Sequence, residues 1–420
     1  MTSADLAPRL AAYAARRMPA ASGVEVRDLS RISGGASRQT YRFRLTWTED
    51  GAPRERRMIL RRDPPVSLID TERRVEFEAY RAFFGSKVPV PEMIWLEEGA
   101  EALDLPFSVA AEITGYEAAP ALLWTERYLA AHETLARNKW TILGEIARAD
   151  PFALGLDRVM PPPEPEGCWV RELDMWETVL DADEAEPLPI ARAAIRWLKA
   201  NPPPPAQKIG VVHGDFRTGN FLYDRQGDIH GVLDWEMAHL GDPLEDLGWS
   251  LNPVWNFKRD LAGGLVPDAV AIAYWEAASG LRADPAAVHW WTLFNCVKGQ
   301  AIWISSARAW IDGGNREPIM VLPAWGMQNP QDRAILKVMG HLLSLTFPPS
   351  SPNSLALWPA TPSRTWTPPS APAPSPSRRH CWAWRPKPGT APPSAWWRRT
   401  VPCAPCWPTP ETALAPMPRS

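Results

Sequence analysis

The sequence has few of the features that mark secreted, membrane-spanning or nucleic-acid-binding proteins. It contains five cysteines in 420 residues, three of them beyond residue 350, too few and too uneven for a disulfide framework. No apolar run approaches the roughly 18 residues of a membrane span, and the N-terminus lacks the apolar core of a signal peptide. The net charge of −3 gives no reason to expect nucleic acid or an anionic membrane as a partner. We therefore expect a protein of the reducing cytoplasm.

The C-terminal part differs in composition from the rest of the chain. From residue 351 onward eight Lys and Arg accompany the single Glu411, a net charge of +7, so residues 1–350 carry −10. This part also holds 18 of the 47 prolines and seven of the 23 tryptophans, without helical or strand periodicity. Such a segment cannot bury enough surface to offset chain entropy, so we expect residues 347–420 to be disordered. A GC-rich gene translated out of frame would give a similar composition, and no nucleic-acid recognition module accompanies the basic residues.

The most informative stretch lies in the middle of the chain. An apolar strand at residues 209–212 leads into His213-Gly214-Asp215, and Asn220 follows five residues after the aspartate. A predicted hairpin over residues 221–233 then ends on Asp234. An acid, an amide and a second acid are therefore expected to converge on one small volume. Phosphoryl transfer needs such a set, because one carboxylate orients a hydroxyl while the amide and the other carboxylate offer hard oxygen ligands to Mg²⁺.

The sequence around these residues resembles that of the aminoglycoside phosphotransferase family, within the protein-kinase-like superfamily. The resemblance rests on an ordered set of short motifs: His213-Gly214-Asp215, Leu233-Asp234-Trp235-Glu236, Gly241-Asp242-Pro243 and Asp246-Leu247. Farther upstream, Leu60-Arg61-Arg62-Asp63-Pro64 is similar to the members of the family associated with acyl-CoA dehydrogenases. A lone His-x-Asp is common in turns, but this ordered set is hard to obtain by chance.

The resemblance implies an α+β, bilobal protein-kinase-like fold. Its small β-rich N-lobe, with the nucleotide-covering sheet and helix, is expected at residues 1–112. The larger helical C-lobe, with the catalytic and metal loops and the acceptor site, is expected at residues 113–346, and the tail follows at 347–420. The periodicity itself predicts helices and strands that fit this plan. Helices are expected at 4–18, 69–84, 124–149, 188–200, 267–280 and 286–312, with another opened by Asp242 and Pro243, and strands at 24–29, up to 47, at 57–61 and at 107–113.

The resemblance also assigns roles at the catalytic and metal loops. Asp215 is expected to orient the acceptor hydroxyl and to accept its proton late in the reaction, because a carboxylate is too weak a base to ionise an alcohol beforehand. Asn220 and Asp234 are expected to hold Mg²⁺. His213 is expected to fix the loop through hydrogen bonds, and Asp246 to steady it.

Four further residues concern the nucleotide phosphates. Gly34 and Gly35 lie between two predicted strands, where the resemblance implies a loop over the phosphates, although a Gly-Gly there also suits a plain hairpin turn. Arg61 occupies the position of a phosphate-binding cation that is usually lysine in the family. Glu76 is expected to pair with Arg61, and Glu78 is the alternative on the same predicted helix.

The function that follows is transfer of the γ-phosphate of ATP, with Mg²⁺, to a hydroxyl of a small molecule. The alternative is a catalytically inactive, pseudokinase-like regulator that binds nucleotide, which the arginine at position 61 favours. The acceptor is not expected to be an aminoglycoside, because residues 251–345 carry eight Lys and Arg against seven Asp and Glu and offer no acidic cleft. An uncharged or anionic, partly apolar alcohol, for example a hydroxyacyl compound, fits better. Several tryptophans at helical spacing in this part could form core or a substrate cage, and the sequence leaves the preference between ATP and GTP open.

Overall fold

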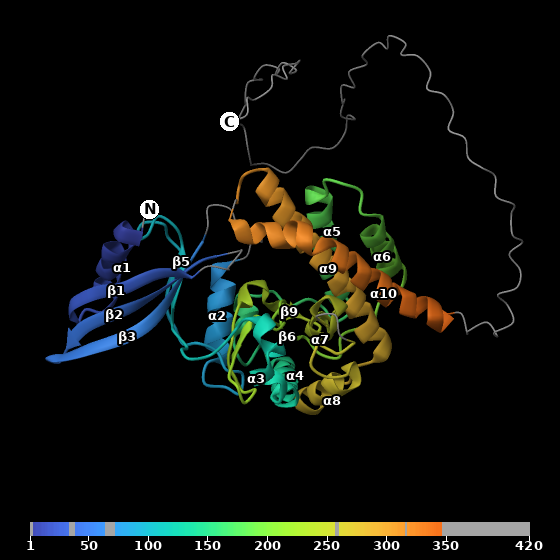
Figure 1. The fold of residues 1–420 in the computed structure, drawn as a ribbon, viewed down its shortest axis with the longest axis horizontal. Coiled ribbons are helices and arrows are strands. Elements are labelled where there is room, and N and C mark those ends of the chain that lie inside the picture. The colour runs from blue at the N-terminus through green and yellow to red at the C-terminus, as the bar shows by residue number, and fades with distance from the viewer. Residues whose placement is uncertain (1–2, 33–37, 64–71, 257–259, 316, 347–420) are drawn as a thin grey trace, which may run out of the picture. The chain divides into compact units, whose positions relative to one another are not determined.

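The chain folds into two lobes in the part that a computed structural model describes, residues 3–32, 38–63, 72–256, 260–315 and 317–346. The N-lobe is built on a five-stranded antiparallel sheet and the C-lobe is mainly helical (Figure 1). This α+β, bilobal fold is the one that the resemblance implied. The loop with Gly34 and Gly35 and the tail at 347–420 lie outside the described residues. Among the described helices, none combines the length and apolar character needed to cross a membrane.

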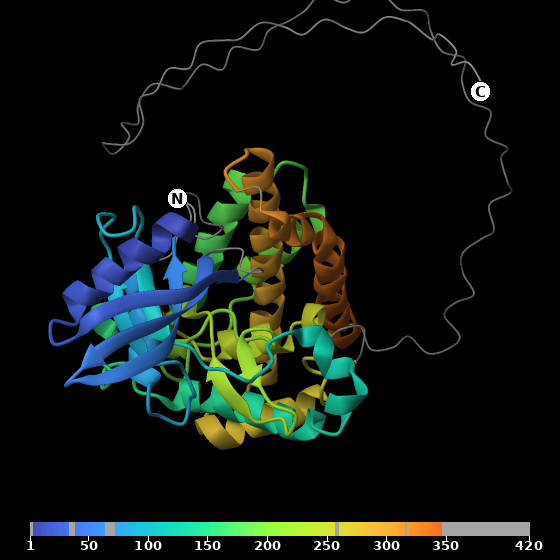
Figure 2. The same cartoon turned by 60° about the vertical axis from the view of Figure 1, so that its left-hand side comes forward.

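The N-lobe sheet has the strand order β1-β2-β3-β5-β4. Its strands are β1 (Ser22–Ile32), β2 (Gln39–Glu49), β3 (Ala52–Arg62), β4 (Met93–Glu97) and β5 (Phe107–Ala111). Helix α1 (Ser3–Arg17) lies across one face of this sheet (Figure 2). Leu6, Leu10 and Tyr13, the apolar face predicted from sequence, are buried in one cluster with Phe43 and Leu60. The period-2 alternation of the strands therefore supplies the surface that the period-3.6 stripe of α1 covers.

Helix α2 (Arg73–Phe83) connects the two lobes. It lies between the sheet and the helical part in Figure 1. Tyr80 and Phe83 are buried in the C-lobe core, where the Phe83 ring stacks on Trp235 with centroids 4.9 Å apart. The sequence predicted this helix from residue 69, but residues 69–71 lie outside the described part. Because α2 packs its apolar face on the C-lobe, a residue on the opposite side of α2 faces the sheet.

The C-lobe helices pack around one long central helix. The lobe contains α4 (His132–Arg148), α5 (Cys168–Asp183), α6 (Pro189–Ala200), α7 (Leu244–Leu251), α8 (Asp268–Ser279), α9 (Pro285–Ile311) and α10 (Gln328–Thr346). Helices α5, α6, α7 and α10 all contact α9. Trp275, Trp290 and Trp291 are at most 1 % exposed, so these tryptophans of the predicted set form core and not a substrate cage.

Three parts of the C-lobe differ from the prediction. The single helix predicted over 124–149 is wrong: the chain forms a 3₁₀ turn at Pro120–Trp124, a short α3 (Glu126–Leu129) and then α4. The physical reason is a tertiary contact, because the left-handed turn at Gly227 (φ +91°) lies against Ala131 and Leu135 at the start of α4, too close to admit a Cβ atom. Helices α5 and α10 were not predicted at all. Both contact α9, and Leu173, Trp176 and Leu180 of α5 are buried.

Four short strands carry the two loops that were expected to hold the catalytic and metal-binding residues. Strand β6 (Gly210–Val212) pairs with β9 (His239–Gly241), and β7 (Phe221–Tyr223) pairs with β8 (Ile229–Val232). The second pair is the predicted hairpin and is confirmed. Together the two pairs hold the His213–Asn220 loop and Asp234 between the sheet of the N-lobe and the helices of the C-lobe.

Candidate active site

Helix α7 fixes the loop after β6 through hydrogen bonds. The carboxylate of Asp246 is 2 % exposed and accepts the backbone N–H groups of His213 (2.6 Å) and Gly214 (2.9 Å). Asp242 accepts the backbone N–H of Leu244 (3.0 Å), but the N-cap of α7 is Pro243 and the helix begins at Leu244, so the predicted start with Asp242 and Pro243 is wrong by one residue. Helix α7 carries Asp246 to the loop.

His213 holds the two loops together. Its Nε2 lies 2.9 Å from the carbonyl oxygen of Leu233, and its Nδ1 accepts the backbone N–H of Asp215 at 3.2 Å. This arrangement requires a neutral ring with the proton on Nε2, since a second ring proton would face the N–H of Asp215. Burial lowers the pKa of His213, in agreement with a neutral imidazole. The ring therefore has a structural role and joins the residue before Asp234 to the loop of Asp215.

Three donors surround the Asp215 carboxylate. The Nδ2 of Asn220 donates to Oδ2 at 2.6 Å, and Oδ1 accepts from the Nε1 of Trp249 (2.9 Å) and the Nε of Arg217 (3.0 Å). The side chain of Asp215 is 15 % exposed, so it is held in place while still reaching the surface. Because the amide nitrogen of Asn220 is used by Asp215, its amide oxygen is free to turn toward another ligand.

Arg61 joins Asp234 to the N-lobe. Its guanidinium lies 2.7 Å from Oδ1 of Asp234 and 2.5 Å from Oε1 of Glu76. Burial acts to raise the pKa of Asp234, but the adjacent guanidinium outweighs it and holds this pKa below its usual value. Asp234 itself has a left-handed backbone (φ +68°), and its N–H donates to the hydroxyl of Tyr80 at 2.8 Å.

The structure chooses between the two glutamates that the sequence left open. Glu76 is 2 % exposed and faces Arg61, whereas Glu78 points outward and pairs with Arg81 at 3.4 Å. The choice follows from the packing of α2, which turns residue 76 toward β3 and residue 78 away from it. Arg61 therefore pairs with Glu76.

A second arginine and a third acid complete this buried cluster. Arg38 is 6 % exposed, forms an ion pair with Asp63, and lies 3.5 Å from Oε2 of Glu236 through its Nε. Burial and the nearby charge of Asp234 raise the pKa of Glu236 to about 8. Two guanidinium groups, those of Arg38 and Arg61, thus lie among buried carboxylates, and of the two only Arg61 lines the cavity described next.

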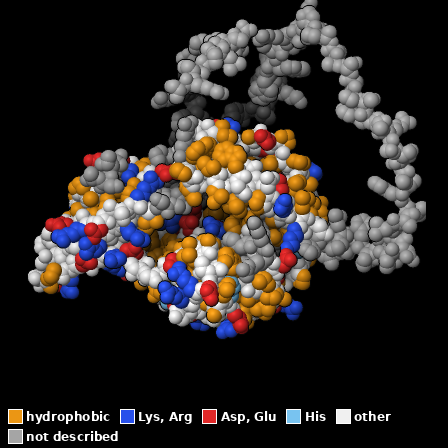
Figure 3. Space-filling model, viewed as in Figure 1, with side chains coloured by type: hydrophobic (Ala, Val, Ile, Leu, Met, Phe, Trp, Pro, Cys, Tyr) orange, Lys and Arg blue, Asp and Glu red, His pale blue; other side chains and the backbone are white. Residues whose placement is uncertain are grey.

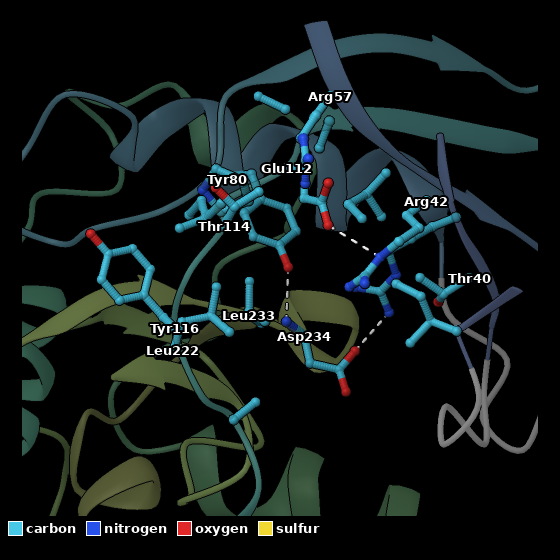
Figure 4. Close-up of a pocket in the computed structure, with 18 of the residues that line it drawn as sticks. Thr40, Arg42, Arg57, Tyr80, Glu112, Thr114, Tyr116, Leu222, Leu233 and Asp234 are labelled. Atoms are coloured by element: carbon cyan, nitrogen blue, oxygen red, sulfur yellow. Dashed lines mark hydrogen bonds and ion pairs between the residues drawn. The ribbon is translucent and has the colours of Figure 1, made fainter. Parts of the chain in front are cut away.

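A cavity of about 600 Å³ opens between the lobes next to this cluster. Its wall on the N-lobe side includes Ile59 and Arg61, and its C-lobe side includes Asn220, Leu222 and Asp234. Figure 4 shows how Tyr80 and Asp234 face each other at one side of the cavity and how Glu112 pairs with Arg42 at another. In the space-filling view the same region appears as a hollow between the lobes (Figure 3). The cavity combines apolar walls with a charged end, as binding sites for small molecules commonly do.

Most of the predicted site residues therefore meet in one place. Arg61, Asn220 and Asp234 line the cavity. Glu76 forms an ion pair with Arg61, and Asp215 accepts a hydrogen bond from Asn220. Gly34 and Gly35 lie outside the described residues. Five contacting residues had no role in the prediction: Arg38, Tyr80, Arg217, Glu236 and Trp249. Of these, only Trp249 could have been predicted from the sequence, because it lies three residues after Asp246 and hence on the same face of α7.

The fold and the site together define the class of this protein, a phosphotransferase with a kinase-like fold. A family model described as the phosphotransferase enzyme family matches residues 28–291. The chain belongs to this family. That family is the one whose motifs the sequence resembles.

Comparison with individual proteins agrees with this membership. The chain is 28 % identical over 232 residues to acyl-CoA dehydrogenase family member 10 of Mus musculus, covering 53 % of this chain and 20 % of that protein. It is 29 % identical over 199 residues to acyl-CoA dehydrogenase family member 11 of Rattus norvegicus, covering 45 % of this chain and 24 % of that protein. The chain thus matches only about a quarter or less of the length of these relatives.

Solved structures share the fold at low sequence identity. A protein of Ralstonia eutropha JMP134, assigned to the aminoglycoside phosphotransferases, superimposes with a TM-score of 0.60 at 18 % identity, over 80 % of this chain and 98 % of that one. A macrolide 2′-phosphotransferase of type I gives a TM-score of 0.52 at 20 % identity, over 77 % and 96 % of the two chains. These likenesses concern the fold alone.

Proposed function

We propose that the chain transfers the γ-phosphate of ATP to a hydroxyl of a small molecule, with Mg²⁺ as cofactor and Asp215 as the residue that orients the hydroxyl and takes its proton. The observation that carries the proposal is the junction at Asn220, which binds the Asp215 carboxylate with its amide nitrogen and lines the cavity beside Asp234. A transferred group at this junction would lie between the acceptor-facing carboxylate and the nucleotide cavity.

The residues at this junction fit a magnesium ion. The carboxylate of Asp234 is 34 % exposed, and Arg61 occupies one of its oxygens, which leaves Oδ2 available. The amide oxygen of Asn220 is a second hard donor, and Mg²⁺ is commonly held by one or two protein oxygens together with water and phosphate. When bound, the ion would offset the negative charge of the nucleotide phosphates.

Arg61 is proposed to bind the phosphates together with the loop of Gly34 and Gly35. Arginine can hold a phosphate through two parallel N–H groups, so its presence in place of lysine is compatible with phosphate binding. Glu76 would keep the guanidinium pointed into the cavity after Asp234 has turned to the metal. The part of the cavity lined by Ile59 and Leu222 is proposed to hold the base of the nucleotide.

The proposed acceptor is an uncharged or anionic, partly apolar alcohol. Residues 251–345 have nearly balanced charges, and acidic side chains on the face in Figure 3 are scattered and not gathered into a patch that would attract a polycation. The two relatives are named for acyl-CoA dehydrogenases, which supports a hydroxyacyl compound as the first acceptor class to test. Kanamycin-dependent ADP release at micromolar kanamycin would contradict this assignment.

One contact favours the alternative of an inactive nucleotide-binding regulator. Arg61 lies 2.7 Å from the proposed metal ligand Asp234, and a guanidinium that stays there would compete with Mg²⁺. The two functions are separated by measuring ADP release from ATP by the full chain, with and without Mg²⁺, in the presence of a panel of alcohols. The proposed enzyme releases ADP only with Mg²⁺ and faster with one acceptor class, whereas a regulator binds ATP and releases no ADP with any of them.

A further inference from the structure

A buried indole contacts the carboxylate of Asp215, and a buried ammonium group lies over the ring of that indole. Trp249 on α7 is 1 % exposed and donates its indole N–H to Oδ1 of Asp215 at 2.9 Å. Lys298 on α9 is also 1 % exposed, and its Nζ lies 5.3 Å from the centre of the Trp249 ring. Two helices far apart in sequence therefore reach the same carboxylate, one directly and the other through an aromatic ring.

The surroundings of Lys298 show that its charge is held in one position. Its Nζ donates to the carbonyl oxygen of Gly214 (2.8 Å) and to Oε1 of Glu245 (3.0 Å), and it lies 5.6 Å from the ring of Trp176 on its other side. Burial acts to raise the pKa of Glu245, but His239 and Lys298 outweigh it and lower that pKa to about 2, so the partner carboxylate remains charged. A buried cation is tolerated only with such compensation.

Trp249 differs from the other two donors of Asp215. Asn220 is proposed to turn its amide oxygen to the metal, and the Arg217 side chain is 28 % exposed on a long flexible stem, stacked 5.0 Å from the ring of Trp255. The indole is rigid and buried on both faces, so it fixes the direction of its N–H. A cation over an indole ring withdraws electron density from it, which strengthens that N–H as a donor.

We propose that Trp249 and Lys298 are positioning residues for Asp215: the indole N–H fixes which carboxylate oxygen faces the acceptor, while the ammonium anchors Gly214 and polarises the indole. The inference rests on the proposed role of Asp215 in proton transfer. Neither residue lines the nucleotide cavity, so their effect should appear in turnover and not in nucleotide affinity.

Trp249→Phe tests the indole bond, because it removes the N–H and keeps an aromatic ring. Trp290→Phe is the matched control: Trp290 is equally buried, but its indole donates to the carbonyl oxygen of Leu198 at 3.2 Å, away from Asp215. With Mg·ATP and water as the acceptor, we expect kcat for ADP release to fall about tenfold or more in Trp249→Phe, the scale of small misplacements in an active site. KM for Mg·ATP and the control should stay within twofold of the wild type.

A spectroscopic readout tests the contact without relying on activity. In the ¹H–¹⁵N spectrum of the indole groups, the signal that is lost in Trp249→Phe belongs to Trp249. We expect it to shift upfield in Asp215→Asn, and also in the charge-balanced double variant Lys298→Met with Glu245→Gln, because each weakens the hydrogen bond.

The proposal is overturned if Trp249→Phe keeps the wild-type kcat, if it loses no more activity than Trp290→Phe, or if the Trp249 signal ignores Asp215→Asn. A failure of the proposed function looks different. In that case Asp215→Asn itself turns over like the wild type, while the indole signal still reports the contact.

Discussion

Replacing Asp246 by Asn should loosen the loop that carries Asp215, because it disturbs two buried hydrogen bonds at the base of that loop. The carboxylate accepts two buried backbone N–H groups, at 2.6 and 2.9 Å, and an asparagine offers one oxygen and one NH₂ in the same place. One N–H therefore loses a charged acceptor, worth about 1.5–3 kcal/mol, and is left buried against another donor, which costs about 1–3 kcal/mol. Since the two terms overlap, we expect about 3 kcal/mol of lost unfolding free energy.

Two measurements test this: the unfolding of the variant by denaturant, and its rate of ADP release from Mg·ATP. Asp284→Asn is the matched control, because Asp284 also accepts two backbone N–H groups, those of Ala286 and Ala287, but does so at the exposed start of α9 where asparagine caps equally well. Asp246→Asn should also slow turnover about tenfold or more, since it shifts the loop that carries Asp215. The reasoning is refuted if Asp246→Asn unfolds at the same denaturant concentration as Asp284→Asn.

Two further predictions concern stability. Burial acts to lower the pKa of His239, but Glu172 and Glu245 outweigh both burial and Lys298 and raise it to about 9 from 6.5. Because the folded value is the higher one, this stabilisation is complete below about pH 6.5 and is lost as pH rises through about 9; unfolding free energies across that range should become flatter in His239→Gln, and an unchanged slope would contradict the assignment. Deleting residues 351–420, which have no periodic apolar face, should leave the melting temperature and the affinity for ATP unchanged, and loss of soluble expression would count against this.

The sequence predicted the candidate site best where its residues belong to short local motifs. The loop from His213 to Asn220, the hairpin that ends on Asp234 and the anchoring residue Asp246 were all predicted, because each follows from a local pattern of strands, turns and charges. The resemblance favoured Glu76 over Glu78 as the partner of Arg61, and only the packing of α2 decided between them.

The parts that were missed depend on contacts between distant segments. The helix is interrupted before α4 because the turn at Gly227 packs against the start of α4. The sequence of residues 124–149 does not contain that turn, so it could not predict the interruption. Tyr80 reaches the backbone of Asp234 across 154 positions of sequence, and Lys298 reaches Gly214 across 84. A pattern within one window cannot contain such pairs, so the fold class and the catalytic loops were predictable while the supporting contacts were not.

The most direct test of the proposed function compares binding and turnover in Asp215→Asn. This change keeps the shape of the side chain and removes its ability to take a proton, whereas Asp234→Ala removes a proposed metal ligand and should weaken Mg·ATP binding and turnover together. Calorimetry with Mg·ATP and single-turnover phosphoryl transfer should therefore show that Asp215→Asn binds like the wild type and transfers phosphate about 10²-fold more slowly or worse. If Asp215→Asn transfers phosphate at the wild-type rate, Asp215 is not the catalytic base.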